Sequence, residues 1–232
     1  MALAQYTSNN YKTNEVFFGA GGSPQATSPN YQANLSLGSL AVGNISSASY
    51  QAFSGFLTPN EPFLEMGIDS SLVDLGVLDT ASTKTGTGTF HVRAYVNSGY
   101  TVQAMSQPPT MTSGGSHTLA AMTSQGGPTT GTEQFGINLV HNTSPATFGS
   151  DPVPQPDGTF ANGQAASGYG TFNQYKYNVG DIIACSGASA PCSTGKGWGL
   201  TNYTISYIAN IGPLTPAGKY TVVQDLVVVA TF

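Results

Sequence analysis

Two cysteines give the most specific chemical signal in the sequence. Cys185 and Cys192 are its only cysteines, and the six residues between them, SGASAP, are small or turn-forming. A structural zinc site needs four ligands, and a redox site of the thioredoxin kind needs a C-x-x-C spacing. This pair has neither, so it predicts a disulfide that staples a short loop and adds about 2 kcal/mol of stability. A disulfide in turn indicates an oxidising compartment.

The residues that most often perform acid–base chemistry are scattered. His91, His117 and His141 are far apart, and none belongs to an H-E-x-x-H or His-x-His pair. Serines are abundant, but there is no G-x-S-x-G nucleophile elbow. We therefore expect no catalytic residues and no enzyme. Of the enzymatic alternatives a glycosidase ranks first, and it would require two carboxyl groups facing each other across a groove.

Acidic residues are densest in one part of the chain. They are Glu61, Glu65, Asp69, Asp74 and Asp79. On strands, whose side chains alternate between faces, such residues are expected to face solvent, and calcium binding is the alternative use of their carboxylates. Asp151 and Asp157 form a second loop with the same alternative. No other metal and no cofactor is predicted.

Aromatic residues supply the strongest argument for ligand binding. Tyr169, Tyr175 and Trp198 fall near expected loops and outward faces, where sugar rings stack well on flat side chains. The alternative is that most of the twelve tyrosines form cross-strand pairs, and for any single tyrosine this alternative is favoured. Trp198 is the natural site for an alanine substitution in a glycan-binding test.

The elements that must position these residues are β-strands. We expect strands at residues 63–68, 72–78, 88–97, 100–106, 133–142, 174–185, 202–211 and 219–232. No stretch keeps a helical period over three turns, and the 29 glycines and 14 prolines would break most helices. The pattern predicts an all-β fold, an antiparallel β-sandwich of the Ig-like or jelly-roll-like kind. The long polar segments 107–132 and 144–173 are expected to carry function or small hairpins.

The stretch 219–232, KYTVVQDLVVVATF, is the clearest strand. Its two faces, which carry Tyr220 and Phe232 among others, are both rich in β-branched and aromatic residues. Only Gln224 and Asp225 interrupt them. The stretch therefore predicts a central strand with partners on both edges and cover on both sides.

The first sixty residues contain a repeat. A serine stands three residues before each of Tyr11, Tyr31 and Tyr50, at periods of 20 and 19 residues. Strands this short cannot bury a core alone, so residues 5–58 must dock on the body of residues 63–232 or on another molecule. A hinge is expected at residues 57–62. We expect Tyr11, Tyr31, Tyr50, Tyr220 and Phe232 to mark the strands of assembly.

Composition and the N-terminus point to an exported protein. Only 7% of the residues are charged, against about 25% in an average domain, and the net charge is -5. Six lysines and arginines spread singly do not fit a nucleic-acid partner. No apolar run reaches the roughly 18 residues that span a bilayer. Ala2, Leu3 and Ala4 resemble a signal-peptidase site, so residues 1–4 are read as a signal-peptide remnant behind an added methionine or as residues added in cloning, the alternative being an ordinary N-terminus. Asn34, Asn44, Asn142 and Asn202 head glycosylation sequons.

Several body motifs resemble a known family. The stretches DLGVL (74–78), GTFHV (88–92), NSGYTV (97–102) and GKYT (218–221) resemble secreted bacterial β-sandwiches of the WxL type and related spore-coat and pilin-like surface domains. The N-terminal repeats resemble SxNYQ-type segments of exported surface proteins. The expected Trp-x-Leu positions instead read Tyr100-Thr101-Val102 and Ala230-Thr231-Phe232, so attachment to peptidoglycan by the WxL route is not expected.

Together these features predict a non-enzymatic, secreted protein of the bacterial cell surface or extracellular matrix. It would be a fibre subunit that assembles by strand addition, or an adhesin. Its expected partners are other copies of itself, other cell-surface components and glycans. The alternative is a carbohydrate-binding module of the cell surface.

Overall fold

The computed structural model divides the chain into two compact units, Met1–Glu61 and Pro62–Phe232, which are described separately. The structure describes residues 6–7, 12–13, 21–28, 31–37, 43–46, 51–54, 63–96, 99–113, 115–155, 157–158, 161–187, 192 and 197–231. The secondary structure of these residues consists of strands, bridges, turns and bends, without a helix. No helix in this part of the chain is therefore long and apolar enough to cross a membrane.

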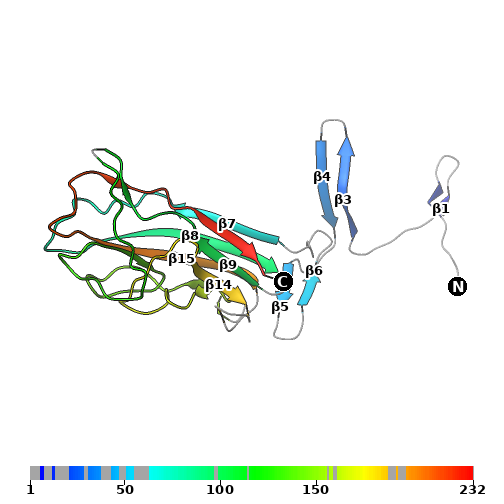
Figure 1. The fold of residues 1–232 in the computed structure, drawn as a ribbon. Helices are drawn as coiled ribbons and strands as arrows, with labels where there is room; N and C mark the ends of the chain where they lie inside the picture. The colour runs from blue at the N-terminus through cyan, green and yellow to red at the C-terminus, as the bar shows by residue number, and fades with distance from the viewer. Residues whose placement is uncertain are drawn as a thin grey trace. The chain divides into compact units, whose positions relative to one another are not determined.

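The first unit consists of antiparallel strand pairs. The pairs are β1 (Tyr6–Thr7) with β2 (Lys12–Thr13), β3 (Gly21–Ser28) with β4 (Tyr31–Leu37), and β5 (Gly43–Ser46) with β6 (Gln51–Ser54). Each pair is a two-stranded sheet of its own among the described residues (Figure 1). Tyr31 opens β4 opposite Ser28. Tyr11 and Tyr50 lie outside the described residues, so the repeat stays a prediction.

The second unit is an antiparallel β-sandwich, which confirms the predicted fold class. The larger sheet has the order β11 (Gln134–Asn138), β15 (Gly197–Asn210), β8 (Lys84–Val96) and β7 (Phe63–Ser70), and β12 (Val153–Gln155) also pairs with β15. The smaller sheet has the order β13 (Gln164–Ala165), β14 (Ile182–Gly187), β9 (Gly99–Ala104) and β17 (Leu226–Ala230). A further pair joins β10 (Thr110–Met111) to β16 (Tyr220–Thr221).

The long pair of β8 and β15 sets the two faces of the larger sheet. Because strand side chains alternate, Phe90 and Val92 of β8 point into the core together with Tyr203 and Ile205 of β15. The Phe90 and Tyr203 rings stack with centroids 4.8 Å apart. Residues of the smaller sheet, such as Val102, complete the same cluster. The core therefore lies between the two sheets, and the alternate side chains of β8 and β15 form an outward face.

The predicted strand 219–232 is interrupted, and the prediction that it is central is wrong. Tyr220 pairs with Met111 in one sheet, whereas β17 pairs with β9 in another. The change of partner occurs within residues 222–225, the last two of which, Gln224 and Asp225, are polar. The Tyr177 hydroxyl donates to Gln224 Oε1 at 3.2 Å, and the Asp225 N–H donates to Ser106 Oγ at 2.5 Å. These contacts take the chain out of one ladder and into the other.

Other expected strands are shorter than predicted or absent. Residues 72–78 form no strand, although Val73 and Leu75 pack against the core. The segment predicted as a strand from residue 174 pairs regularly only from Ile182 onward, after single bridges at Tyr175 and Lys176. These segments are loops that cover the core. A loop that covers the core also points apolar side chains inward, so its sequence can alternate as a strand's does.

An amide network holds the ends of the long segment 144–173. Asn138 and Asn142 are fully buried and exchange hydrogen bonds, Nδ2 to Oδ1, at 2.7 and 2.9 Å. Asn142 Oδ1 also accepts from the Asn173 N–H at 3.0 Å. Asn173 adopts a left-handed backbone, and its own Oδ1 accepts from the N–H of Thr143 and of Ser144. The sequon at Asn142 is therefore closed to modification in the folded protein, whereas Asn202 is exposed.

Candidate functional site

Strand β17 forms an edge of the smaller sheet. In the part of the chain that the structure describes, it pairs with β9 alone. The Thr231 N–H donates to the Gly99 carbonyl at 2.8 Å, and the Asp225 carbonyl accepts from the Met105 N–H at 2.9 Å. Because these directions alternate along a strand, the odd-numbered residues face β9. The backbone N–H and C=O groups of Leu226, Val228 and Ala230 therefore point to the outer side.

The side chains of this edge are apolar and partly exposed. Val227 and Val229 are 42% and 46% exposed, and both lie on the outer face of the smaller sheet. Leu226, Val228 and Ala230 pack against the core. Natural edge strands are usually protected by charge, proline or a bulge, and Leu226–Ala230 has none of these. Strand β7, the edge of the other sheet, comes near β17, so the two edges lie on the same side of the sandwich (Figure 1).

A second candidate site lies on the outward face of the larger sheet. Phe63 of β7, Tyr95 of β8 and Trp198 of β15 are register partners on three neighbouring strands. The Phe63 and Tyr95 ring centroids are 6.3 Å apart with planes at 23°, and those of Tyr95 and Trp198 are 6.2 Å apart at 25°. Each of the three residues is partly exposed. We call these three residues the aromatic row.

Three polar side chains and one leucine occupy the next positions of the same face. Glu65, Arg93, Leu200 and Gln155 occupy one register row across β7, β8, β15 and β12. The Arg93 guanidinium carbon lies 5.3 Å from the centre of the Phe63 ring, which is a cation–π distance. The face therefore combines flat apolar rings with charged and amide groups.

The following register row contains His91. Its Nδ1 lies 2.8 Å from Asp69 Oδ1, and its ring covers Gly67 of the adjacent strand. A Cβ at position 67 would lie 2.5 Å from the His91 ring, so only glycine leaves room for this arrangement. Asn202 is the partner of His91 on the other side and is exposed. Asp69 and His91 thus form a side-chain hydrogen bond with each other at the margin of the face.

The prediction that Tyr169 and Tyr175 stack on a ligand is wrong, because both side chains are buried. Tyr169 and Tyr175 are 1% and 0% exposed, so neither offers a ring face to a ligand. The Tyr169 hydroxyl donates to Asp181 Oδ2 at 2.9 Å, and the Tyr175 hydroxyl donates to the Ser144 carbonyl at 2.9 Å. Burial raises the pKa of both phenols. Tyr169, in the long polar segment 144–173, and Tyr175, just after it, thus hold this part of the chain through buried side chains. Of the three predicted residues, Trp198 alone lies on an outward face.

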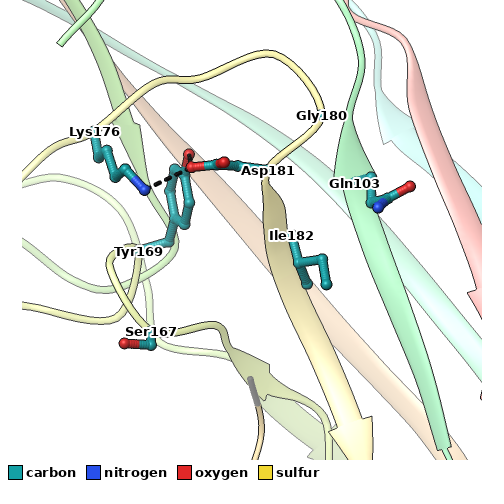
Figure 2. Close-up of a pocket in the computed structure, with 7 residues that line it drawn as sticks. All are labelled: Gln103, Ser167, Tyr169, Lys176, Gly180, Asp181 and Ile182. Carbon is teal, nitrogen blue, oxygen red and sulfur yellow. Dashed lines mark hydrogen bonds and ion pairs between the residues drawn. The ribbon is translucent and has the colours of Figure 1, made fainter. Parts of the chain in front are cut away.

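A hollow of about 350 Å³ lies beside β14. Figure 2 shows residues that line it, with Lys176 reaching Asp181 past the Tyr169 ring. Lys176 Nζ lies 2.6 Å from Asp181 Oδ2. Burial alone would raise the pKa of Asp181, but hydrogen bonds from Lys176, Tyr169 and Asn178 outweigh it and lower this pKa. The Asp181 carboxylate therefore stays ionised at neutral pH. The hollow holds its ion pair with Lys176.

Each histidine is paired with a carboxylate. Nδ1 of His91 and of His141 contact Asp69 and Asp151, and Nε2 of His117 contacts Glu133, all within 2.8–3.0 Å. The rings of His117 and His141 also meet Tyr220 and Phe172. The three pairs lie on separate elements. Among the described residues, these contacts bring no serine or cysteine nucleophile to a histidine.

The acidic residues also act separately. In the described ranges, no three His, Cys, Asp or Glu side chains are grouped to hold a metal ion. Asp79 pairs with Lys84 at 2.9 Å and accepts from Ser82 and the Ala81 N–H, and the hydrogen bond from Lys84 contributes most to its lowered pKa. Asp74 accepts from the Gly76 N–H. Glu61 lies outside the described residues.

The predicted disulfide is confirmed. Cys185, in β14, is bonded to Cys192, and both are buried beside Ala166. Of the predicted assembly residues, Tyr220 lies in β16 and its hydroxyl donates to the Pro216 carbonyl at 2.7 Å, so it is not part of the free edge. Phe232 lies outside the described residues.

In the described residues, the fold and the two candidate sites define an antiparallel β-sandwich with an apolar edge strand, β17, that pairs on one side alone, and with an aromatic outward face. Comparison of the chain with known protein families, with curated proteins and with solved structures returned no match.

Proposed function

We propose that the protein is a non-enzymatic, exported structural protein of the bacterial cell surface or extracellular matrix, which assembles into fibres by strand addition. The observation that carries this proposal is the outer edge of β17. Its backbone groups at residues 226, 228 and 230 point away from β9, and its exposed valines extend an apolar surface beside them. A strand that adds to this edge gains a ladder of hydrogen bonds and covers apolar area.

The donor is the N-terminal unit of a second copy. Its described strands pair as separate two-stranded sheets, and such sheets are marginally stable in water without further packing. Strands β3 and β4, with eight and seven residues, are each longer than the five residues of β17. Residues 21–37 carry no charged side chain, so pairing with an apolar edge buries no charge.

The disulfide and the composition support export. The Cys185–Cys192 bond belongs to an oxidising environment. A surface made soluble by hydroxyl and amide groups, with only 7% charged residues, also reduces repulsion between neighbouring subunits. These features support a protein that works outside the cell at high local concentration.

The test uses the full chain and a single backbone change. Val228→Pro removes an N–H from the outer side of β17 and leaves the N–H groups of residues 227, 229 and 231 free to bond β9. The matched control, Val228→Ala, shortens the same side chain but keeps the N–H. We expect high-mass assemblies of the wild type and the control by light scattering and electron microscopy, and monomers of Val228→Pro. Thermal melting checks that all three are folded.

A deletion identifies the donor. Removal of residues 5–37 should yield a folded monomer that caps assemblies of the intact protein when the two are mixed. The proposal fails if the intact protein stays monomeric at every concentration, or if Val228→Pro assembles as the wild type does.

A second candidate, a carbohydrate-binding module, is favoured by a different observation, the aromatic row. Its residues lie on the face of the larger sheet and not on the edge of the smaller one.

A further inference from the structure

The aromatic row is more than a pairing device between two strands. Cross-strand aromatic pairs stabilise sheets, but here three rings lie side by side on three strands and remain partly exposed on the outward face. Neighbouring strands are about 4.8 Å apart, so the row extends for about 10 Å across the sheet. This is an extended apolar strip rather than a pocket, and it fits a chain-like ligand that lies across the strands.

The side chains beside the row provide hydrogen bonds of both kinds. Arg93 donates only, Glu65 accepts only, and Gln155 and Asn202 do both. All four are exposed: Glu65, Arg93 and Gln155 lie in the register row next to the aromatic row, and Asn202 lies in the row after that. A ligand rich in hydroxyl groups needs this mixture, because each hydroxyl donates and accepts.

The charges of this face do not favour an ionic ligand. Among the described residues of this face, Arg93 is the one fixed positive charge, and it lies over the Phe63 ring with Glu65 as its register partner. Asp69, the other carboxylate, is engaged with His91. One arginine beside one carboxylate attracts neither a phosphate backbone nor a polyanion strongly.

We propose that the outward face of the larger sheet binds a neutral polysaccharide chain, with sugar rings against Phe63, Tyr95 and Trp198 and hydroxyl groups bonded by Glu65, Arg93, Gln155 and Asn202. The apolar faces of pyranose rings pack on aromatic side chains, and their edges carry the hydroxyls that the flanking residues meet. This site is independent of strand addition, because it lies on another sheet and uses side chains rather than a free edge.

The sequence contains a natural reporter for the test. Trp198 is the only tryptophan, so the intrinsic fluorescence of the protein reports on the proposed site directly. Cellohexaose, chitohexaose and mannohexaose serve as probes for the full chain. We expect at least one of them to shift the tryptophan emission to shorter wavelength and to protect it from acrylamide quenching, and calorimetry to give a saturable isotherm.

Three variants complete the experiment. Trp198→Ala and Tyr95→Ala should each weaken binding of that probe at least tenfold. The matched control, Phe172→Ala, removes an aromatic residue that is 44% exposed beside His141 and belongs to none of the strands of this face, and should bind as the wild type does. Far-UV circular dichroism on heating checks the fold of each variant.

Two results overturn the proposal. One is the absence of any fluorescence or calorimetric response to all three hexasaccharides. The other is unchanged binding by Trp198→Ala and Tyr95→Ala. Val228→Pro should keep the full response, so failure of the fibre proposal and failure of this one are distinguishable.

Discussion

The hydroxyl groups of Tyr100 and Tyr203 lie 2.8 Å apart in the core and join the two sheets of the sandwich. Tyr100 belongs to β9 and Tyr203 to β15, and both are almost fully buried. Burial raises the pKa of each phenol, so both hydroxyls stay protonated and each can donate or accept. This hydrogen bond fixes how the sheets sit on each other, because it spans the apolar space between them.

We expect Tyr203→Phe to lower the free energy of unfolding by about 1–2 kcal/mol, because the buried Tyr100 hydroxyl loses its hydrogen bond to Tyr203. Tyr207→Phe is the matched control. It also removes a hydroxyl from a largely buried tyrosine of β15, but one that forms no hydrogen bond among the described contacts and is not enclosed, so its effect should be near zero. Urea unfolding of both variants measures the difference, and equal losses would contradict the role given to the Tyr100–Tyr203 bond.

The Glu133 carboxylate should make stability depend on pH. Burial alone would raise its pKa, but hydrogen bonds from Thr215, His117 and the Ala120 N–H outweigh it, so the pKa in the folded protein is lowered from 4.5. A carboxyl group with a depressed folded pKa stabilises the protein above its unfolded pKa, and this contribution is lost as the pH falls through the folded value. Glu133→Gln should therefore lower stability at pH 7 by about 1–3 kcal/mol.

The difference between wild type and Glu133→Gln should shrink as the pH is lowered below about 4.5. Denaturant titrations at pH 7, 5, 4 and 3 measure it. A difference that stays constant down to pH 3 would show that the ionised carboxylate is not the source of the effect.

Loss of the disulfide should cost about 2 kcal/mol of stability. The variant Cys185→Ser/Cys192→Ser removes both buried sulfurs, and reduction of the wild type by dithiothreitol is the second route to the same state. Both should lower the melting temperature, and the variant should not respond to the reductant. Melting temperatures that are the same with and without the bond would contradict this prediction.

Gly99 should tolerate no side chain. Its φ is +122°, and an added Cβ would overlap the Ser186 carbonyl of the paired strand. At a site with room for a Cβ, replacing glycine by alanine stabilises a protein by up to about 1 kcal/mol, because alanine loses less backbone entropy on folding. At Gly99 the overlap reverses this effect, so Gly99→Ala should destabilise the protein by more than about 1 kcal/mol. Gly158→Ala is the control, because no atom lies within 4 Å of a Cβ built there. Thermal melting of the two variants separates strain from a general effect of alanine.

The parts of the fold that follow from local sequence were predictable. The alternation of apolar and polar residues in β8 and β15 predicted both strands and the side chains that face the core, because a period of two residues depends only on the strand itself. The spacing of Cys185 and Cys192 led to the disulfide in the same way. The break at Gln224 and Asp225 was visible as two polar residues, but its effect depends on Ser106 and Tyr177, which are distant in sequence.

The candidate site was less accessible to sequence reasoning. Phe63, Tyr95 and Trp198 are separated by 32 and 103 positions, and only the register of three strands brings them together. Each of the three alternates with core residues along its strand, which indicates an outward position. The sequence of one strand does not reveal which strands lie beside it, so the row itself could not be predicted. Tyr169 and Tyr175 were misjudged for the converse reason. They lie in polar surroundings in sequence, while the segments that carry them fold onto the sheet and bury the rings.

The two edge strands also determine how the sandwich responds to force. Phe63 lies opposite Tyr95 and Ala230 opposite Tyr100, on either side of the connection between β8 and β9, so the chain enters and leaves the sandwich at the same end. Tension between these two points would peel β7 and β17 away one hydrogen bond at a time. A strand held along the whole of β17 and pulled lengthwise would instead load all its hydrogen bonds together. The sandwich by itself should therefore yield at low force, and mechanical strength would come from the strand that it receives.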